Sequence, residues 1–131
     1  MTVSPFLRNV LLLDALVSGA TGLVLVLGAG LAEPLLGLPA ALARGAGFVL
    51  LPFAAIVGWL ATRPSLPRGA VWSVIVVNAL WAIDSVVLLL TGWVAPTGLG
   101  IAFVLFQAIV VAGFAELQWL GLRRSSAAVA A

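Results

Sequence analysis

Cysteine and histidine are both missing from the 131-residue sequence. Without cysteine the chain can form no disulfide and perform no thiol redox chemistry, and without histidine it lacks the commonest general base. Together the two absences exclude histidine-ligated haem and almost every kind of zinc site. We therefore expect neither a metal nor a cofactor.

Charge is also scarce. Only 8% of the residues are charged, whereas soluble domains carry about 25%, and 64% of the residues are hydrophobic. A soluble domain of this size could not bury so much apolar surface, so the composition indicates a membrane protein. The net charge is +2, and its positive charges are all arginines spread along the chain. We therefore expect no nucleic-acid partner.

Four apolar stretches are long enough to cross a bilayer, which takes about 20 residues per helix. The segments "AEPLLGLPA", "TRPSLPRG" and "GWVAPTG" separate them, and their prolines favour helix boundaries. The pattern predicts an all-α transmembrane four-helix bundle. Residues 1–124 form its single membrane domain, and residues 125–131 form a mobile tail. The expected spans are about 6–32, 40–62, 70–94 and 98–122.

The arginines predict the orientation of these spans. Five of the six lie on the side that also holds both termini, namely Arg8, Arg63, Arg68, Arg123 and Arg124. The opposite side has only Arg44. By the positive-inside rule, we expect a multi-pass protein of the bacterial inner membrane with both termini in the cytoplasm.

Two pairs of segments repeat a pattern. "DALVSGATG" at 14–22 and "DSVVLLLTG" at 84–92 share Asp, Val, Thr and Gly at equal spacing. The stretches at 45–58 and 100–113 share Gly, Phe-Val-Leu and Gly. Such an echo is expected of a parallel duplication of a two-helix hairpin. Chance is the alternative, because apolar segments draw on few residue types.

Seven polar or amphipathic side chains inside the spans are the candidate site residues. On the first span, Asp14, Ser18 and Thr21 fall on one face of a helix. On the third span, Asn78, Trp81 and Ser85 share a face, with Asp84 at its shoulder. The candidates are Asp14, Ser18, Thr21, Asn78, Trp81, Asp84 and Gln107.

Depth along the helices places these side chains in two layers. Asp14 and Asn78 lie at one level, with Glu116 as a candidate third member, and Asp84 pairs with Gln107 at the other. The structural interpretation is hydrogen bonding between spans, which is worth about 0.6 kcal/mol per bond on average. The functional interpretation is a site for a proton, a cation or a small polar ligand. The third interpretation is that these side chains contact another subunit.

The segment "EPLLGLPAALARG" at 33–45 begins with Glu33-Pro34, which favours a helix start. It predicts either a short helix along the outer face of the membrane, with Arg44 close enough to pair with Glu33, or an ordinary surface loop.

The motifs "GLP" at 37–39, "NALW" at 78–81 and "LGLRR" at 120–124 resemble small bacterial four-span integral membrane proteins of unassigned function. This resemblance implies the fold rather than an activity. Four spans and an acid at position 14 are also similar to the small multidrug resistance transporters. Their aromatic pattern around the acid is absent here, and their function is not carried over.

We expect a protein that is not an enzyme, because no nucleophile–base pair is evident. It would bind a lipid-like ligand between its helices, or the spans of a larger membrane complex. The alternative is an oligomeric small-solute or proton-coupled transporter or channel that uses Asp14 and Asp84. The expected partners are therefore membrane lipids and either further copies of the chain or a larger membrane complex.

Overall fold

A computed structural model describes the backbone of residues 1–130 and the side chains of residues 1–125. This part of the chain is all-α, as predicted, and contains five helices. Their bounds are α1 (Pro5–Leu27), α2 (Ala29–Leu36), α3 (Ala40–Ala61), α4 (Arg68–Thr91) and α5 (Gly98–Ala130). All except α2 are long and apolar enough to cross a membrane. The chain is therefore a multi-pass membrane protein.

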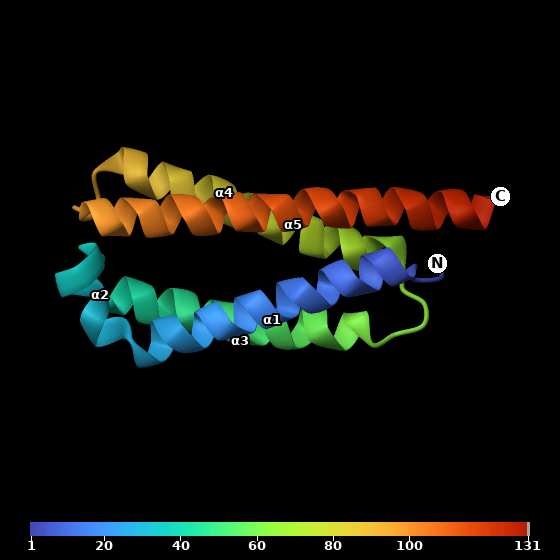
Figure 1. Cartoon of the computed structure of the whole chain (residues 1–131), viewed down its shortest axis with the longest axis horizontal. Helices are drawn as coiled ribbons and strands as arrows, with labels where there is room; N and C mark the ends of the chain where they lie inside the picture. The colour runs from blue at the N-terminus through green and yellow to red at the C-terminus, as the bar shows by residue number, and fades with distance from the viewer. Residues whose placement is uncertain (131) are drawn as a thin grey trace.

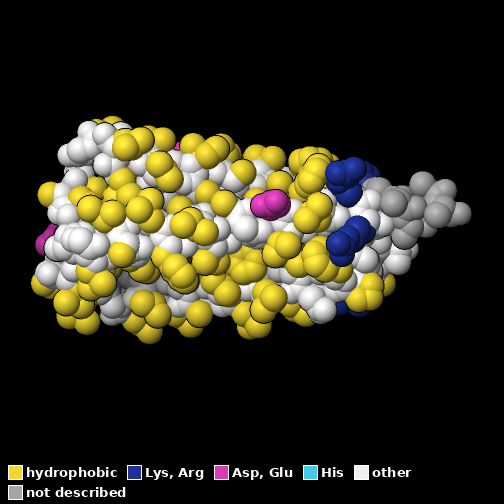
Figure 2. All heavy atoms as spheres, turned by 45° about the horizontal axis from the view of Figure 1, so that its top comes forward, with side chains coloured by type: hydrophobic (Ala, Val, Ile, Leu, Met, Phe, Trp, Pro, Cys, Tyr) yellow, Lys and Arg dark blue, Asp and Glu magenta, His cyan; other side chains and the backbone are white. Residues whose placement is uncertain are grey.

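The four long helices form two hairpins, α1 with α3 and α4 with α5 (Figure 1). The N-terminus and the end of α5 lie at one end of the bundle, and α2 lies at the other end. On the face shown in Figure 2, the arginine side chains lie toward the end that holds the N-terminus, while apolar side chains cover the length between the ends. We call the two ends the arginine end, which holds Arg8, Arg63, Arg68, Arg123 and Arg124, and the α2 end.

The first span is shorter than expected. The Ser4 side chain caps α1 by accepting a hydrogen bond from the backbone N–H of Leu7 (3.2 Å), and Pro5 occupies the first turn. α1 then ends at Leu27, and Gly28 separates it from α2. The predicted stretch 6–32 therefore combines a spanning helix with the beginning of a short one. Hydropathy does not reveal this break, because both parts are equally apolar.

The short helix lies within the predicted segment but differs from it in its bounds. α2 begins at Ala29, so Pro34 lies inside the helix instead of at its start. Gly37 ends it with a φ of 69°, a conformation that favours glycine. Glu33 is exposed, and no ion pair joins it to Arg44 within the described residues. At the start of α5, Thr97 donates to the backbone oxygens of Leu35 and Leu36, which holds α2 against α5.

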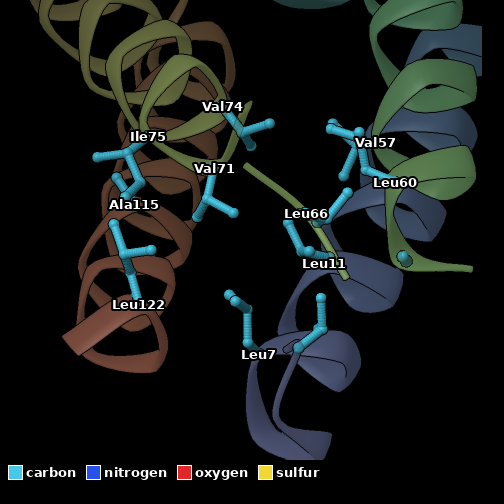
Figure 3. Packing of buried hydrophobic residues seen from close by; sticks show 12 residues of the cluster. Leu7, Leu11, Val57, Leu60, Leu66, Val71, Val74, Ile75, Ala115 and Leu122 are labelled. Atoms are coloured by element: carbon cyan, nitrogen blue, oxygen red, sulfur yellow. The ribbon is translucent and has the colours of Figure 1, made fainter. Parts of the chain in front are cut away.

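The apolar core lies toward the arginine end, where side chains of both hairpins point toward one another (Figure 3). The N-terminal segment closes this end by pairing with the loop before α4, through hydrogen bonds between Val3 and Pro64 and between Met1 and Leu66. The side chain of Arg8 donates to the backbone oxygens of Ala61, the last residue of α3, and of Arg63 just beyond it. The leucine, isoleucine and valine members of the core are Val3, Leu7, Leu11, Val57, Leu60, Leu66, Val71, Val74, Ile75 and Leu122.

Close approach of α1 and α3 depends on two facing glycines. A Cβ at Gly47 would lie 2.7 Å from the backbone oxygen of Gly22, and a Cβ at Gly22 would lie 3.2 Å from that of Gly47. Small residues at this crossing let the two backbones pack directly, which is how membrane helices gain contact where hydrocarbon gives no driving force.

Two expectations stay predictions. The pairing of helices into two hairpins is the arrangement that a duplication would produce, but it equally suits an unrelated pair. The second is the mobile tail predicted at 125–131. Most side chains of this segment lie outside the described part of the chain, and the backbone of α5 is helical as far as Ala130.

Candidate functional site

Asp14 is the centre of a closed cluster of polar side chains. It is completely buried, and its carboxylate accepts hydrogen bonds from Ser18 Oγ (2.9 Å), Asn78 Nδ2 (2.7 Å) and Gln118 Nε2 (2.6 Å). Asn78 Nδ2 also donates to Gln118 Oε1 at 3.0 Å. The cluster joins α1, α4 and α5, and every member is buried. We call Asp14, Ser18, Asn78 and Gln118 the Asp14 cluster.

The cluster confirms the predicted pairing of Asp14 with Asn78 and corrects its third member. Glu116 is exposed on α5, and Gln118 takes the place considered for it. Gln118 lies 11 residues after Gln107, which is close to three full turns, so both amides point into the bundle. Glu116 lies nine residues after Gln107 and points to the opposite side. Helix phase is the signal that identifies Gln118, because it places Gln118 on the same face as Gln107.

The polar face of α1 continues from the Asp14 cluster toward the α2 end. Ser18 belongs to the cluster, and Thr21, nearly one turn further, lines a cavity. The predicted face of Asp14, Ser18 and Thr21 is therefore confirmed, but it serves two separate places: a closed cluster and an open cavity.

The cavity has a volume of about 480 Å³ and lies between the two hairpins in the half of the bundle toward the α2 end. All five helices contribute to its wall. Most wall residues are apolar, including Leu25, Leu36, Leu42, Leu88 and Phe103. The exposed wall residues belong to α3 and α4, namely Ala41, Leu42, Gly45, Val49 and Asp84. The mouth of the cavity therefore lies between these two helices, which pack on other helices more than on each other.

A chain of hydrogen bonds fixes three polar side chains of the wall. Trp81 Nε1 donates to Gln107 Oε1 at 2.8 Å, and Gln107 Nε2 donates to Ser85 Oγ at 2.9 Å. Ser85 Oγ in turn donates to the backbone oxygen of Trp81 at 2.7 Å. The expectation that Trp81 faces protein or a cavity is thus confirmed. These bonds hold α4 and α5 together beside the cavity and fix the rotamers of all three side chains.

Asp84 does not form the predicted pair with Gln107, whose side chain is already engaged by Trp81, Ser85 and the backbone oxygen of Val104. The prediction was wrong because Asp84 lies one position, or 100°, before Ser85 on the helix. The Asp84 side chain is exposed at the cavity wall and makes no hydrogen bond with another described residue. Thr21 is half-buried at the cavity wall, and its hydroxyl also makes no hydrogen bond with another described residue.

A second hollow of about 420 Å³ lies between α4 and α5. It is lined by Ala82, Ile83, Val86, Val87, Leu105, Ala108, Ile109 and Ala112. No polar side chain contributes to this wall, so nothing there would orient a ligand. Polar anchoring distinguishes the first cavity as the candidate site.

The described residues contain no group of three or more acids that could hold a metal ion. No family model matches the chain, and comparisons with curated proteins and with solved structures gave no match. Function must therefore be inferred from the geometry of the Asp14 cluster and of the cavity.

Proposed function

We propose that the protein binds a small amphiphilic ligand from the surrounding membrane in the cavity between its hairpins, without transforming it chemically. The observation that carries this proposal is the combination of an apolar wall with a fixed group of polar side chains. Binding sites for small molecules have volumes of about 300–1,000 Å³ and few, well-placed polar groups among apolar ones. The cavity of about 480 Å³, with Trp81, Ser85 and Gln107 on its wall, meets both conditions.

The position of the mouth supports entry from the bilayer. Leu42 and Val49, at the mouth, are 38% and 58% exposed, and large apolar side chains around them are exposed as well. In a membrane these surfaces face lipid chains. An amphiphile could therefore move from the bilayer into the cavity without crossing water.

Substitution of Gly45 offers a direct test of this proposal. It lines the cavity, and a Cβ added there would meet no heavy atom within 4 Å. Gly45→Leu therefore adds a large side chain at the mouth of the cavity, where its Cβ meets no neighbour. Gly113→Leu is the matched control, because Gly113 also has free space around its Cα but lies outside the cavity wall.

Native mass spectrometry of protein extracted in mild detergent reports stoichiometry and retained ligand together. We expect a bound small amphiphile on the natural chain and on Gly113→Leu, and its loss from Gly45→Leu. Equal retention by all three proteins would show that the cavity is not the site. Retention of another protein chain in its place would favour a role within a larger membrane complex.

We also propose that the arginine end faces the cytoplasm of a bacterial cell. Its five arginines against a single Arg44 toward the α2 end support this orientation. Cation–π contacts of Arg63 with Trp59 and of Arg123 with Trp119 fit the place where aromatic rings and headgroups meet.

The alternative function is a transporter or channel in which Asp14 and Asp84 carry protons or cations. Only Asp84 supports it, because its carboxylate is exposed at the cavity. Asp14 accepts three hydrogen bonds inside a buried cluster. To take up and release an ion it would have to break that cluster, so ligand binding is the proposal that the geometry favours.

A further inference from the structure

We propose that the ligand of the cavity is a cationic amphiphile whose ammonium group pairs with Asp84. This inference rests on the proposed function and adds the chemical class of the ligand. Among the residues that the structure describes, Asp84 is the one charged side chain on the cavity wall, and it has no hydrogen-bond partner.

The depth of Asp84 makes an unpaired carboxylate unfavourable in the absence of a ligand. Asp84 lies seven residues before the end of α4 at Thr91, which places it about 10 Å from the helix end. An acid at such a depth is expected to face a partner, water or a functional cavity. Asp14 accepts hydrogen bonds from three protein donors, whereas Asp84 lines a cavity of ligand size and has no such donor among the described residues.

Neighbouring groups suit an ammonium ion. Trp81 precedes Asp84 by three residues, lines the same cavity and offers an aromatic ring of the kind that attracts organic cations. Thr21 contributes a hydroxyl from α1 that can accept a hydrogen bond. No arginine contributes to the wall, so the one charged side chain that an anionic headgroup would meet there is Asp84, which carries the same sign of charge.

The apolar part of the wall indicates the remainder of the ligand. Leu25, Leu36, Leu88 and Phe103 all lie between the polar side chains and the α2 end. A ligand would therefore place its cation at the level of Asp84 and its hydrocarbon among these residues. This arrangement fits an alkylammonium or another cation with one apolar body.

Three probes of equal chain length test this inference: dodecylammonium, 1-dodecanol and dodecanoate. Each is titrated into the full-length protein in non-ionic detergent micelles, and native mass spectrometry measures the bound fraction. On the natural chain we expect dodecylammonium to bind at least about tenfold more tightly than 1-dodecanol, and dodecanoate to bind most weakly.

Two acidic positions provide the variants. Asp84→Asn should reduce the preference for dodecylammonium over 1-dodecanol at least about tenfold, and Asp84→Glu should keep most of it. Glu116→Gln removes the same charge from an exposed position outside the cavity wall and should leave the preference unchanged. The two probes are compared within each variant. A general loss of folding would lower the binding of both probes and leave their ratio unchanged, so it would not be mistaken for the expected result.

The outcomes separate the two proposals. If Gly45→Leu lowers the binding of 1-dodecanol but Asp84→Asn leaves the preference for dodecylammonium intact, the cavity is a binding site and the inference about Asp84 is wrong. If dodecanoate binds as tightly as dodecylammonium, the inference is also wrong. If Gly45→Leu changes the binding of no probe, the proposed function fails, and the inference fails with it.

Discussion

Replacement of Asp14 tests the structural role of the Asp14 cluster. Asp14→Ala removes all three hydrogen bonds that the carboxylate accepts. The side-chain amides of Asn78 and Gln118 then lose the acceptor that they share. Asp14→Asn is a gentler change. One amide oxygen in the position of Oδ2 can still accept from Asn78 and Gln118, and the amide nitrogen can donate to the Ser18 hydroxyl, which is able to accept.

The expected magnitudes follow from these bonds. Two of the three join different helices, and interhelical bonds in membranes are worth about 0.6–1.7 kcal/mol each. Buried donors left unpaired add to the loss. We therefore expect Asp14→Ala to lower the free energy of unfolding by about 2–4 kcal/mol, and Asp14→Asn to change it by less than about 1 kcal/mol. Glu116→Gln should cause no measurable change, because Glu116 is exposed.

Reversible unfolding in mixed micelles, followed by circular dichroism, measures these differences. The reasoning predicts the order natural chain, Asp14→Asn and then Asp14→Ala, with a clear gap before the last. If Asp14→Asn were as destabilising as Asp14→Ala, the negative charge itself would be needed, and hydrogen bonding between helices would not explain the residue. If neither variant changed stability, the cluster would contribute nothing to the fold.

Three further predictions concern topology and packing. A reporter fused after Arg124 should read cytoplasmic and one inserted in the loop between α2 and α3 should read external; the reverse pattern would contradict the orientation inferred from the arginines. Gln107→Leu leaves the indole N–H of Trp81 without its acceptor and should lower the free energy of unfolding by about 1–2 kcal/mol in the same unfolding assay; an unchanged value would show that the bond contributes nothing. Gly100→Ala places a Cβ against the backbone at the end of α2 and should cost about 1–3 kcal/mol. Gly98→Ala, which meets no atom within 4 Å, is its control, and equal stabilities would exclude the predicted clash.

The spans were predictable because hydropathy and proline positions depend on local sequence. The expected stretch 40–62 agrees with α3 to within one residue. The break at Gly28 was not predictable in the same way, because glycine is common inside membrane helices and the flanking residues are equally apolar. The position of α2 depends on contacts that are distant in sequence, namely the hydrogen bonds from Thr97, at the start of α5, to the backbone at the end of α2.

Part of the site was also predictable. Asp14 and Asn78 could be paired because each has a definite depth and face, and few partners exist at that depth. The pairing of Gln107 was missed because depth alone does not choose between neighbouring positions on α4. The rotation of α4 places Trp81 and Ser85 toward α5 and leaves Asp84 at the cavity. The cavity itself forms because the two hairpins diverge toward the α2 end. Local sequence patterns do not predict how two hairpins are placed relative to each other.

Photolabelling tests the central claim, that the cavity between the hairpins holds an amphiphile, most directly. The full-length protein in lipid bilayers is irradiated with a neutral long-chain alcohol that carries a diazirine in its chain, and the modified residues are mapped by peptide mass spectrometry. We predict that adducts concentrate on residues 42–49 of α3 and 81–88 of α4, and that Gly45→Leu removes them while Gly113→Leu does not. Adducts spread evenly over the lipid-facing surface, or concentrated in the hollow between α4 and α5, would contradict the claim.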